Sequence, residues 1–189
     1  MKPEKEKATI TLLDVRMAVS VLICYTAAML LADVAGIKFT WGNYSLEILQ
    51  KMTCCISCFL CCQDNTKVSL RAGINRLIIT AIGGVVAIVI IALDCVIGND
   101  WVEMLMIVAG VLLTLFLCKL AGVPYINARI GCVTLILVAC TLNSTARIWY
   151  GVFRLLSTLF AVLVVLLVTW IFDKVQASRA PAEEQTAAQ

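Results

Sequence analysis

Two arginines, Arg76 and Arg154, are the residues of this chain whose type and position best suit binding chemistry. Each follows a short polar segment and leads into an apolar run long enough for a membrane helix. A guanidinium offers a planar fork of donors that matches a carboxylate, and helix N-termini also favour anions. We therefore predict that both arginines lie at helix N-termini and that at least one of them contacts an anion. The alternative is that each is an anchor whose side chain reaches water at the membrane surface.

The residues around these arginines occur twice, at an offset of 78 positions. The matching pairs are Asn65 and Asn143, Gly73 and Gly151, Arg76 and Arg154, Leu77 and Leu155, Thr80 and Thr158, Cys54 and Cys132, and Cys62 and Cys140. A single offset of this length is too long for a solenoid repeat, but it suits a membrane protein built from two copies of one unit. The sequence therefore predicts an internal duplication.

Four more polar residues are candidates for contact with the same ligand. Thr80 and Thr158 follow the two arginines by one helical turn, and Asn127 and Arg129 lie early in another apolar run. An ionisable residue within a membrane helix is a functional candidate, although Arg129 would also serve as a snorkelling anchor. For the threonines the alternative is close contact between helices, which small residues at this spacing permit.

Three further basic residues, Lys67, Arg71 and Arg147, lie in the two polar segments that precede the arginines. Basic side chains at the mouth of a site raise the local concentration of anions. The same side chains also bind the headgroups of anionic lipids. We interpret them as candidate entrance residues, with lipid contact as the alternative.

The composition indicates an all-α integral membrane protein. Hydrophobic residues make up 62% of the chain and charged residues 14%, with a mean hydropathy of +0.99. A soluble domain has about 45–50% apolar and about 25% charged residues, so most of these side chains must face lipid or other helices. Apolar runs predict six spans at residues 14–35, 44–62, 75–97, 101–118, 124–142 and 152–172.

The predicted organisation is a short tail at residues 1–11, a membrane domain at residues 12–173, and a disordered tail at residues 174–189. Within the membrane domain, the first repeat covers about residues 12–98 and the second about residues 99–173. The last segment is rich in Ala, Glu and Gln, which is typical of a solvated tail. No cleavable signal peptide is predicted, because residues 1–10 are charged and no cleavage site follows a short apolar core.

The distribution of basic residues predicts the orientation. With the N-terminus in the cytoplasm, eleven of the fifteen Lys and Arg residues fall inside and four fall outside. This bias favours a multi-pass protein of the plasma or inner membrane, in a bacterial cell, with both termini in the cytoplasm. Because each repeat has three spans, the second copy would be inverted relative to the first. Transporters of this construction bind their substrate at the interface between the repeats.

Residues 63–84, with the sequence QDNTKVSLRAGINRLIITAIGG, resemble the signature of the fusaric acid resistance and aromatic acid exporter superfamily. In that signature a Thr, a Ser and a Gly precede an Arg-x-x-x-Thr-x-x-Gly helix. The matching residues here are Thr66, Ser69, Gly73, Arg76, Thr80, Gly83 and Gly84. The second copy is degenerate, with Ala161 in the place of the Gly. Residues 12–172 are also similar to the membrane domain of aluminium-activated malate transporters. The resemblance implies six helices per protomer, a homodimer or larger homo-oligomer, and passage of organic anions.

Other functional classes find little support in the sequence. The run of cysteines at residues 54–62 suggests a metal site, but thiols in an apolar helix stay protonated and behave as small hydrophobic groups. We therefore predict core packing for them, no metal and no cofactor. The chain has no histidine, no phosphate-binding Gly loop and no paired acidic motif, so an enzyme is not expected. A net charge of only +3 argues against nucleic acid as a partner.

The function that the sequence favours is transport or export of small organic anions, aromatic acids or other carboxylates. Two alternatives stay open at this point. One is a passive anion channel, which the same residues would serve equally well. The other is a membrane subunit that does not transport and that binds a partner protein or lipid.

Overall fold

The computed structural model describes residues 11–34, 36, 38–41, 44–141 and 146–187. Helix α1 (Leu12–Met29) continues into the π-helical turn η1 (Leu30–Val34), and a hairpin of β1 (Lys38–Trp41) and β2 (Tyr44–Glu47) follows. The remaining helices are α2 (Lys51–Cys61), α3 (Thr66–Ile97), α4 (Asp100–Leu120), α5 (Tyr125–Cys140) and α6 (Ala146–Ala187). The fold is therefore helical, as predicted, with one short hairpin that the sequence analysis did not anticipate.

Four of the described helices are long and apolar enough to cross a membrane. They cover Leu12–Val34, Thr66–Ile97, Trp101–Leu120 and Ala146–Gln176. The other two, α2 and α5, have 11 and 16 residues and extend over about 16 Å and 24 Å, less than the roughly 30 Å of a bilayer core. The prediction of a helical membrane protein agrees with this structure. The two remaining spans of the predicted six coincide with the short helices.

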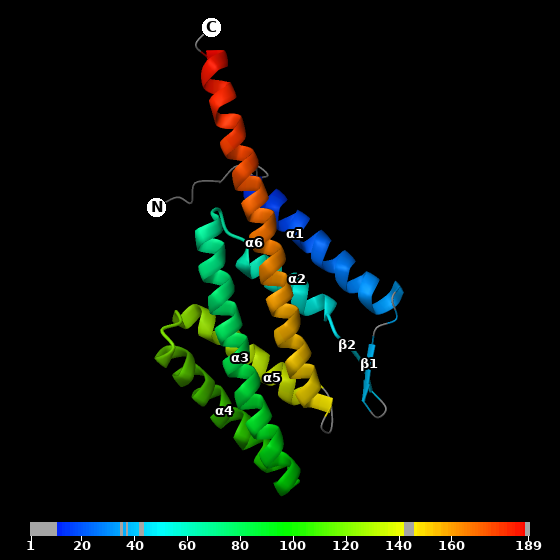
Figure 1. Ribbon diagram of the computed structural model, residues 1–189. Helices are drawn as coiled ribbons and strands as arrows, with labels where there is room; N and C mark the ends of the chain where they lie inside the picture. The colour runs from blue at the N-terminus through cyan, green and yellow to red at the C-terminus, as the bar shows by residue number, and fades with distance from the viewer. Residues whose placement is uncertain (1–10, 35, 37, 42–43, 142–145, 188–189) are drawn as a thin grey trace, which may run out of the picture.

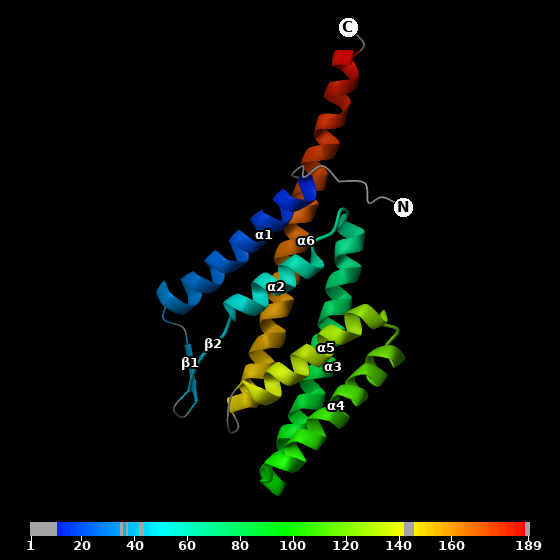
Figure 2. The same cartoon turned by 180° about the vertical axis from the view of Figure 1, so that it is seen from behind.

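The long helices α3 and α6 form the centre of the molecule and run side by side in opposite directions (Figures 1 and 2). Helices α1 and α2 pack against α6, whereas α4 and α5 pack against α3. Each central helix also contacts the short helix that directly precedes it in the chain: α2 contacts α3, and α5 contacts α6. Every peripheral helix is therefore positioned by the central pair.

Several element boundaries differ from the sequence prediction. The predicted span at residues 44–62 begins as strand β2, and its helix begins only at Lys51. Helix α3 begins at Thr66 instead of residue 75, because the Asn65 side chain accepts a hydrogen bond from the backbone N–H of Lys67 and caps the helix there. Helix α6 begins at Ala146 instead of residue 152, so most of the second polar segment is helical too; residues 142–145 lie outside the described residues.

The segment predicted to be a disordered tail also differs. Residues 174–187 continue α6 as one helix, and Figure 1 shows this end extending away from the bundle (red). Ala, Glu and Gln, which dominate the segment, have high intrinsic helix propensity. Polarity and helix formation are therefore compatible here, and composition alone did not separate a solvated helix from a disordered chain.

The two clusters of core residues, one on each side of the central helix pair, differ in composition. Between α1, α2 and α6 it consists of cysteines and small aliphatic residues, namely Cys24, Cys54, Cys58, Cys61, Cys62, Ala161, Val162 and Val165. Between α3 and α5 it is built from larger aliphatic residues such as Ile91 and Leu135. Small side chains let the helices of the first cluster approach closely. The cysteine run of α2 is thus part of this core.

Two adjacent glycines in α3 have opposite surroundings and supply a matched test of close helix contact. A Cβ on Gly83 would lie 2.5 Å from the backbone oxygen of Gly131 in α5, whereas a Cβ on Gly84 would meet nothing within 4 Å. We expect Gly83→Ala to destabilise the fold by roughly 1–3 kcal/mol through overpacking, and Gly84→Ala to leave it unchanged or slightly stabilised. Denaturant titration followed by circular dichroism measures both. Equal stability of the two variants would contradict the close α3–α5 contact.

Candidate functional site

Arg76 and Arg154 lie within the two central helices. Arg76 is about three turns after the start of α3, and Arg154 is about two turns after the start of α6. The expectation that both occupy helix N-termini is therefore wrong, because each helix begins earlier than the hydropathy pattern indicates. Both side chains are almost fully buried, at 4% and 5% exposure. They are not anchors at the water surface, and free backbone N–H groups do not accompany them.

The two guanidinium groups lie near each other between α3 and α6. They are close enough for mutual electrostatic repulsion. Among the residues that the structure describes, no carboxylate lies within ion-pairing distance of either group. Arginine remains protonated in proteins, so the described part of the core holds two positive charges without a counter-charge. The burial of like charges in this way is costly unless something negative compensates them.

Arg154 has polar partners, but they are neutral. Its Nη1 donates to the Oγ1 of Thr53 in α2 at 3.3 Å, and the phenol of Tyr150, one turn earlier in α6, interacts with the same guanidinium. Its Nε is buried without a hydrogen-bond partner. Neutral acceptors orient the side chain but do not balance its charge. The carboxylate-paired Arg16 and Arg147 also have a buried Nε without a partner, so the missing counter-charge, and not this donor, distinguishes Arg154.

Arg76 is less well satisfied than Arg154. Its Nε and Nη1 are both buried without a hydrogen-bond partner, and besides Arg154 the thiol of Cys61 lies close enough to interact electrostatically with it. A thiol in such a core stays protonated and supplies no negative charge. Two orphaned donors on one buried cation are rare in folded proteins and call for a specific explanation.

One face of the short helix α2 connects the surroundings of the two arginines. Thr53 touches Arg154, Cys61 lies near Arg76, and Ser57 is between them at the same spacing of four residues. Residues four apart lie on one side of a helix, so Ser57 belongs to this row. Ser57 is fully buried, and its hydroxyl has no hydrogen-bond partner. Sequence reasoning overlooked Thr53 and Ser57, although their polar spacing within a cysteine-rich helix was visible.

Thr80 and Thr158 make the same contact in the two central helices. The Thr80 hydroxyl donates to the backbone oxygen of Arg76 at 2.8 Å, and that of Thr158 donates to the backbone oxygen of Arg154 at 2.9 Å. Both side chains are buried. Because each proton is already donated within its own helix, neither hydroxyl is available as a donor to an anion. Their arrangement fits helix contact better than ligand binding.

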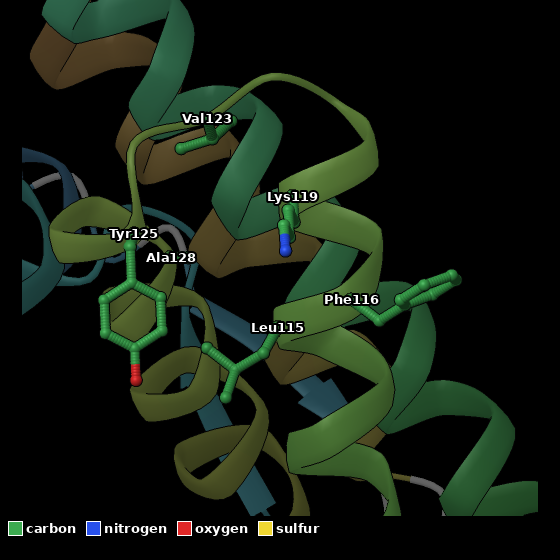
Figure 3. Close-up of a pocket in the computed structure, with 6 residues that line it drawn as sticks. All are labelled: Leu115, Phe116, Lys119, Val123, Tyr125 and Ala128. Atoms are coloured by element: carbon green, nitrogen blue, oxygen red, sulfur yellow. The ribbon is translucent and has the colours of Figure 1, made fainter.

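Asn127 and Arg129 lie apart from the arginine pair. Arg129 is exposed, and its guanidinium lies over the ring of Tyr125, 4.9 Å from the ring centroid. Close by, an apolar pocket of about 510 Å³ opens at the turn between α4 and α5, with Lys119 and Tyr125 as its polar members (Figure 3). Its other lining residues are Leu115, Phe116, Val123 and Ala128. The structure gives this pocket no link to Arg76 or Arg154.

The three candidate entrance residues have different surroundings. Lys67 and Arg71 are exposed in the first turns of α3. Arg147 is mostly buried, and its Nη1 lies 3.0 Å from a carboxylate oxygen of Glu103 and 3.4 Å from one of Asp94. These ion pairs join the start of α6 to the end of α3 and the start of α4. We call Arg147, Asp94 and Glu103 together the lower clamp.

An upper clamp occurs at the opposite end of the central helices. Arg16 of α1 pairs with Asp173 of α6 at 3.0 Å, and Asp173 also accepts hydrogen bonds from the backbone and the hydroxyl of Thr66, at the start of α3. Arg16 donates in addition to the backbone oxygen of Asp64 at 2.8 Å. The Arg76 and Arg154 pair thus lies between two charged clamps. Each clamp holds a different peripheral helix against the central pair.

A second pocket reaches Arg154 from the side of the β-hairpin. It has a volume of about 410 Å³ and is lined by Ser45, Leu46, Glu47, Gln50, Lys51, Met52, Thr53, Ile56, Leu137, Tyr150 and Arg154. The lining combines apolar side chains with the guanidinium and a few hydroxyl and amide groups. Lys51 at its rim is paired with Asp33 at 2.8 Å and with Glu47 at 3.3 Å. This composition suits an anion that carries an apolar body.

Comparison with known proteins gives no relative for this chain: no family model, no curated protein and no solved structure matches it. In the described residues, no group of three or more His, Cys, Asp or Glu side chains has the geometry of a metal site. The arginine pair and its pocket are therefore the basis for a functional interpretation.

The upper clamp offers a test of how far the buried arginines depend on carboxylates. Asp173→Asn leaves the buried Arg16 without its counter-charge and should reduce the stability by roughly 1–3 kcal/mol, since Asp173 itself is 35% exposed. Asp33→Asn is the matched control, because Asp33 forms ion pairs on the surface at 43% exposure and should cost less than about 1 kcal/mol. Denaturant midpoints of both variants give the comparison. A larger loss in Asp33→Asn would show that the clamp is not the stronger contact.

Proposed function

We propose that the protein transports small organic anions across a membrane and that Arg76 and Arg154 form the region through which the anion passes. The observation that carries this proposal is the pair of buried guanidinium groups without a carboxylate partner among the described residues. A permanent structural role would be better served by an acidic partner, as at the two clamps. Two neighbouring buried arginines without an acidic partner suit a site that an anion enters and leaves.

The pocket beside Arg154 supports a carboxylate with an apolar body as the substrate. Its guanidinium would hold the carboxylate, while Leu46, Met52 and Ile56 would contact the apolar part. The aromatic and other carboxylates expected from the resemblance to aromatic acid exporters have this chemistry. A volume of about 410 Å³ falls within the ordinary range for small-molecule sites, which is about 300–1,000 Å³.

An inverted repeat gives a physical reason for the arrangement of the arginines. In this proposal α1 to α3 form one unit and α4 to α6 the other, with the arginines at the interface between the two units. The antiparallel course of α3 and α6 and the short middle helices α2 and α5 support it. A homodimer or larger homo-oligomer in the plasma or inner membrane, with lipids around it, completes the proposal. A passive anion channel would use the same residues; it would carry current without a coupling ion gradient.

Flux and binding in liposomes test the role of Arg154. A charge-assisted hydrogen bond contributes roughly 1.5–3 kcal/mol, so Arg154→Ala should weaken benzoate binding about ten- to a hundredfold and reduce flux. Arg154→Lys should restore only part of the affinity, since Lys keeps the charge and loses the fork. Lys174→Ala is the control, because Lys174 is an exposed basic residue of α6 outside the pocket and outside the candidate entrance residues. Unchanged binding and flux in Arg154→Ala would refute the proposed role, and with it the main support for transport.

Topology is tested by reagent accessibility of single cysteines in a background without the ten native ones. The inverted arrangement requires a cysteine at Lys67 to react from the cytoplasmic side and one at Arg147 to react from the opposite side. Both termini should be cytoplasmic, as reporter fusions would show. If residues 67 and 147 react from the same side, the inverted repeat is wrong.

A further inference from the structure

The charge around Arg76 is unbalanced in a way that the carboxylate pocket does not correct. The pocket of about 410 Å³ has Arg154 in its lining, but Arg76 is not among its lining residues. Arg76 is nevertheless buried, with Nε and Nη1 both lacking a hydrogen-bond partner. A carboxylate at the Arg154 end of the pocket therefore leaves these two donors without an acceptor. These two donors are therefore available to a second, separate ligand.

Water alone does not satisfy the requirements of this position. A water molecule accepts hydrogen bonds from N–H groups, but it brings no negative charge against two neighbouring guanidinium groups. A counter-charge lowers the cost of a buried charge more than neutral acceptors do, and no carboxylate among the described residues provides one. An anion would therefore be the ligand that stabilises this position most.

The surroundings set the size of that anion. One turn before Arg76, helices α3 and α6 cross so closely that a Cβ on Gly73 would lie 2.6 Å from a methyl carbon of Val162. The row of Thr53, Ser57 and Cys61 on α2 faces the same region, with Cys61 near Arg76. Ser57 adds a fully buried hydroxyl that has no partner. This close helix contact one turn from Arg76 leaves little room, so a monatomic ion suits the position better than a molecule with an apolar body.

We propose that Arg76 and Ser57 form a separate inner site for a small monovalent inorganic anion of the halide class, distinct from the carboxylate pocket at Arg154. In this site the guanidinium donates through Nε and Nη1, and Ser57, on the α2 face that also carries Cys61, donates through its hydroxyl. The bound halide offsets the repulsion between Arg76 and Arg154 and so stabilises the contact between α3 and α6. This site is a property of the folded protein and does not depend on transport.

Chloride binding to the purified full-length protein in detergent tests the inner site. The measurement is the excess broadening of the chloride NMR line that exchange with protein-bound chloride causes. Gluconate replaces all other anions in the buffer, and added bromide should displace the bound chloride and remove the broadening. We expect Arg76→Gln to abolish the excess broadening. Ser57→Ala should weaken chloride binding about tenfold, as expected for loss of one hydrogen bond to a charged group.

Ser20→Ala is the matched control for Ser57→Ala. Ser20 is equally buried, but its hydroxyl already donates to the backbone oxygen of Arg16 at 2.8 Å, so its removal should leave chloride binding unchanged. Wild-type protein without excess broadening, or equal affinity in Ser57→Ala and wild type, would overturn the site; the second outcome decides even if Arg76→Gln does not fold. If the wild-type protein binds chloride but carries no benzoate flux, the transport proposal is wrong and the inner site stands.

Discussion

The feature on which the rest of this structure depends is the burial of two like charges, one in each central helix. Desolvation and mutual repulsion both oppose the placement of Arg76 and Arg154 in the same core. The surrounding structure compensates with neutral donors and acceptors on α2 and with close helix contacts that hold α3 and α6 together. Cysteine, glycine and alanine are concentrated there because only small side chains let the backbones approach while two long side chains occupy the interior.

The two clamps show how carboxylate-paired arginines differ from the central pair in the same molecule. Arg16 and Arg147 are also largely buried, and each has at least one carboxylate partner from a different helix. Such pairs fix the relative position of helix ends, because the geometry of the pair is lost if either helix shifts. The central arginines have no such restraint from carboxylates among the described residues. The ends of the bundle are therefore held by ion pairs, whereas in the described part of its middle two like charges lie without a carboxylate partner.

Sequence reasoning reached the helical membrane class and the main helices, because hydropathy follows from local composition. It singled out the two arginines because two segments 78 positions apart carry the same residues. It placed the helix starts too late, since it gave more weight to the polarity of residues 66–74 than to the capping ability of Asn65. It divided the last helix at residue 173 for the same reason. The pairing of Arg16 with Asp173 joins residues far apart in the chain, and no periodic pattern reports such a contact. Ser57 was hidden within a run interpreted only as cysteine packing.

Because α6 is one continuous helix from Ala146 to Ala187, the part that projects from the bundle and the part that carries Arg154 form a single rod. From Arg154 to Ala187 this rod extends over about 50 Å. Any displacement of the projecting end as part of this rigid helix would therefore be carried to the turn of α6 that holds Arg154. The ion pair between Arg16 and Asp173 lies between these two regions and opposes such a displacement.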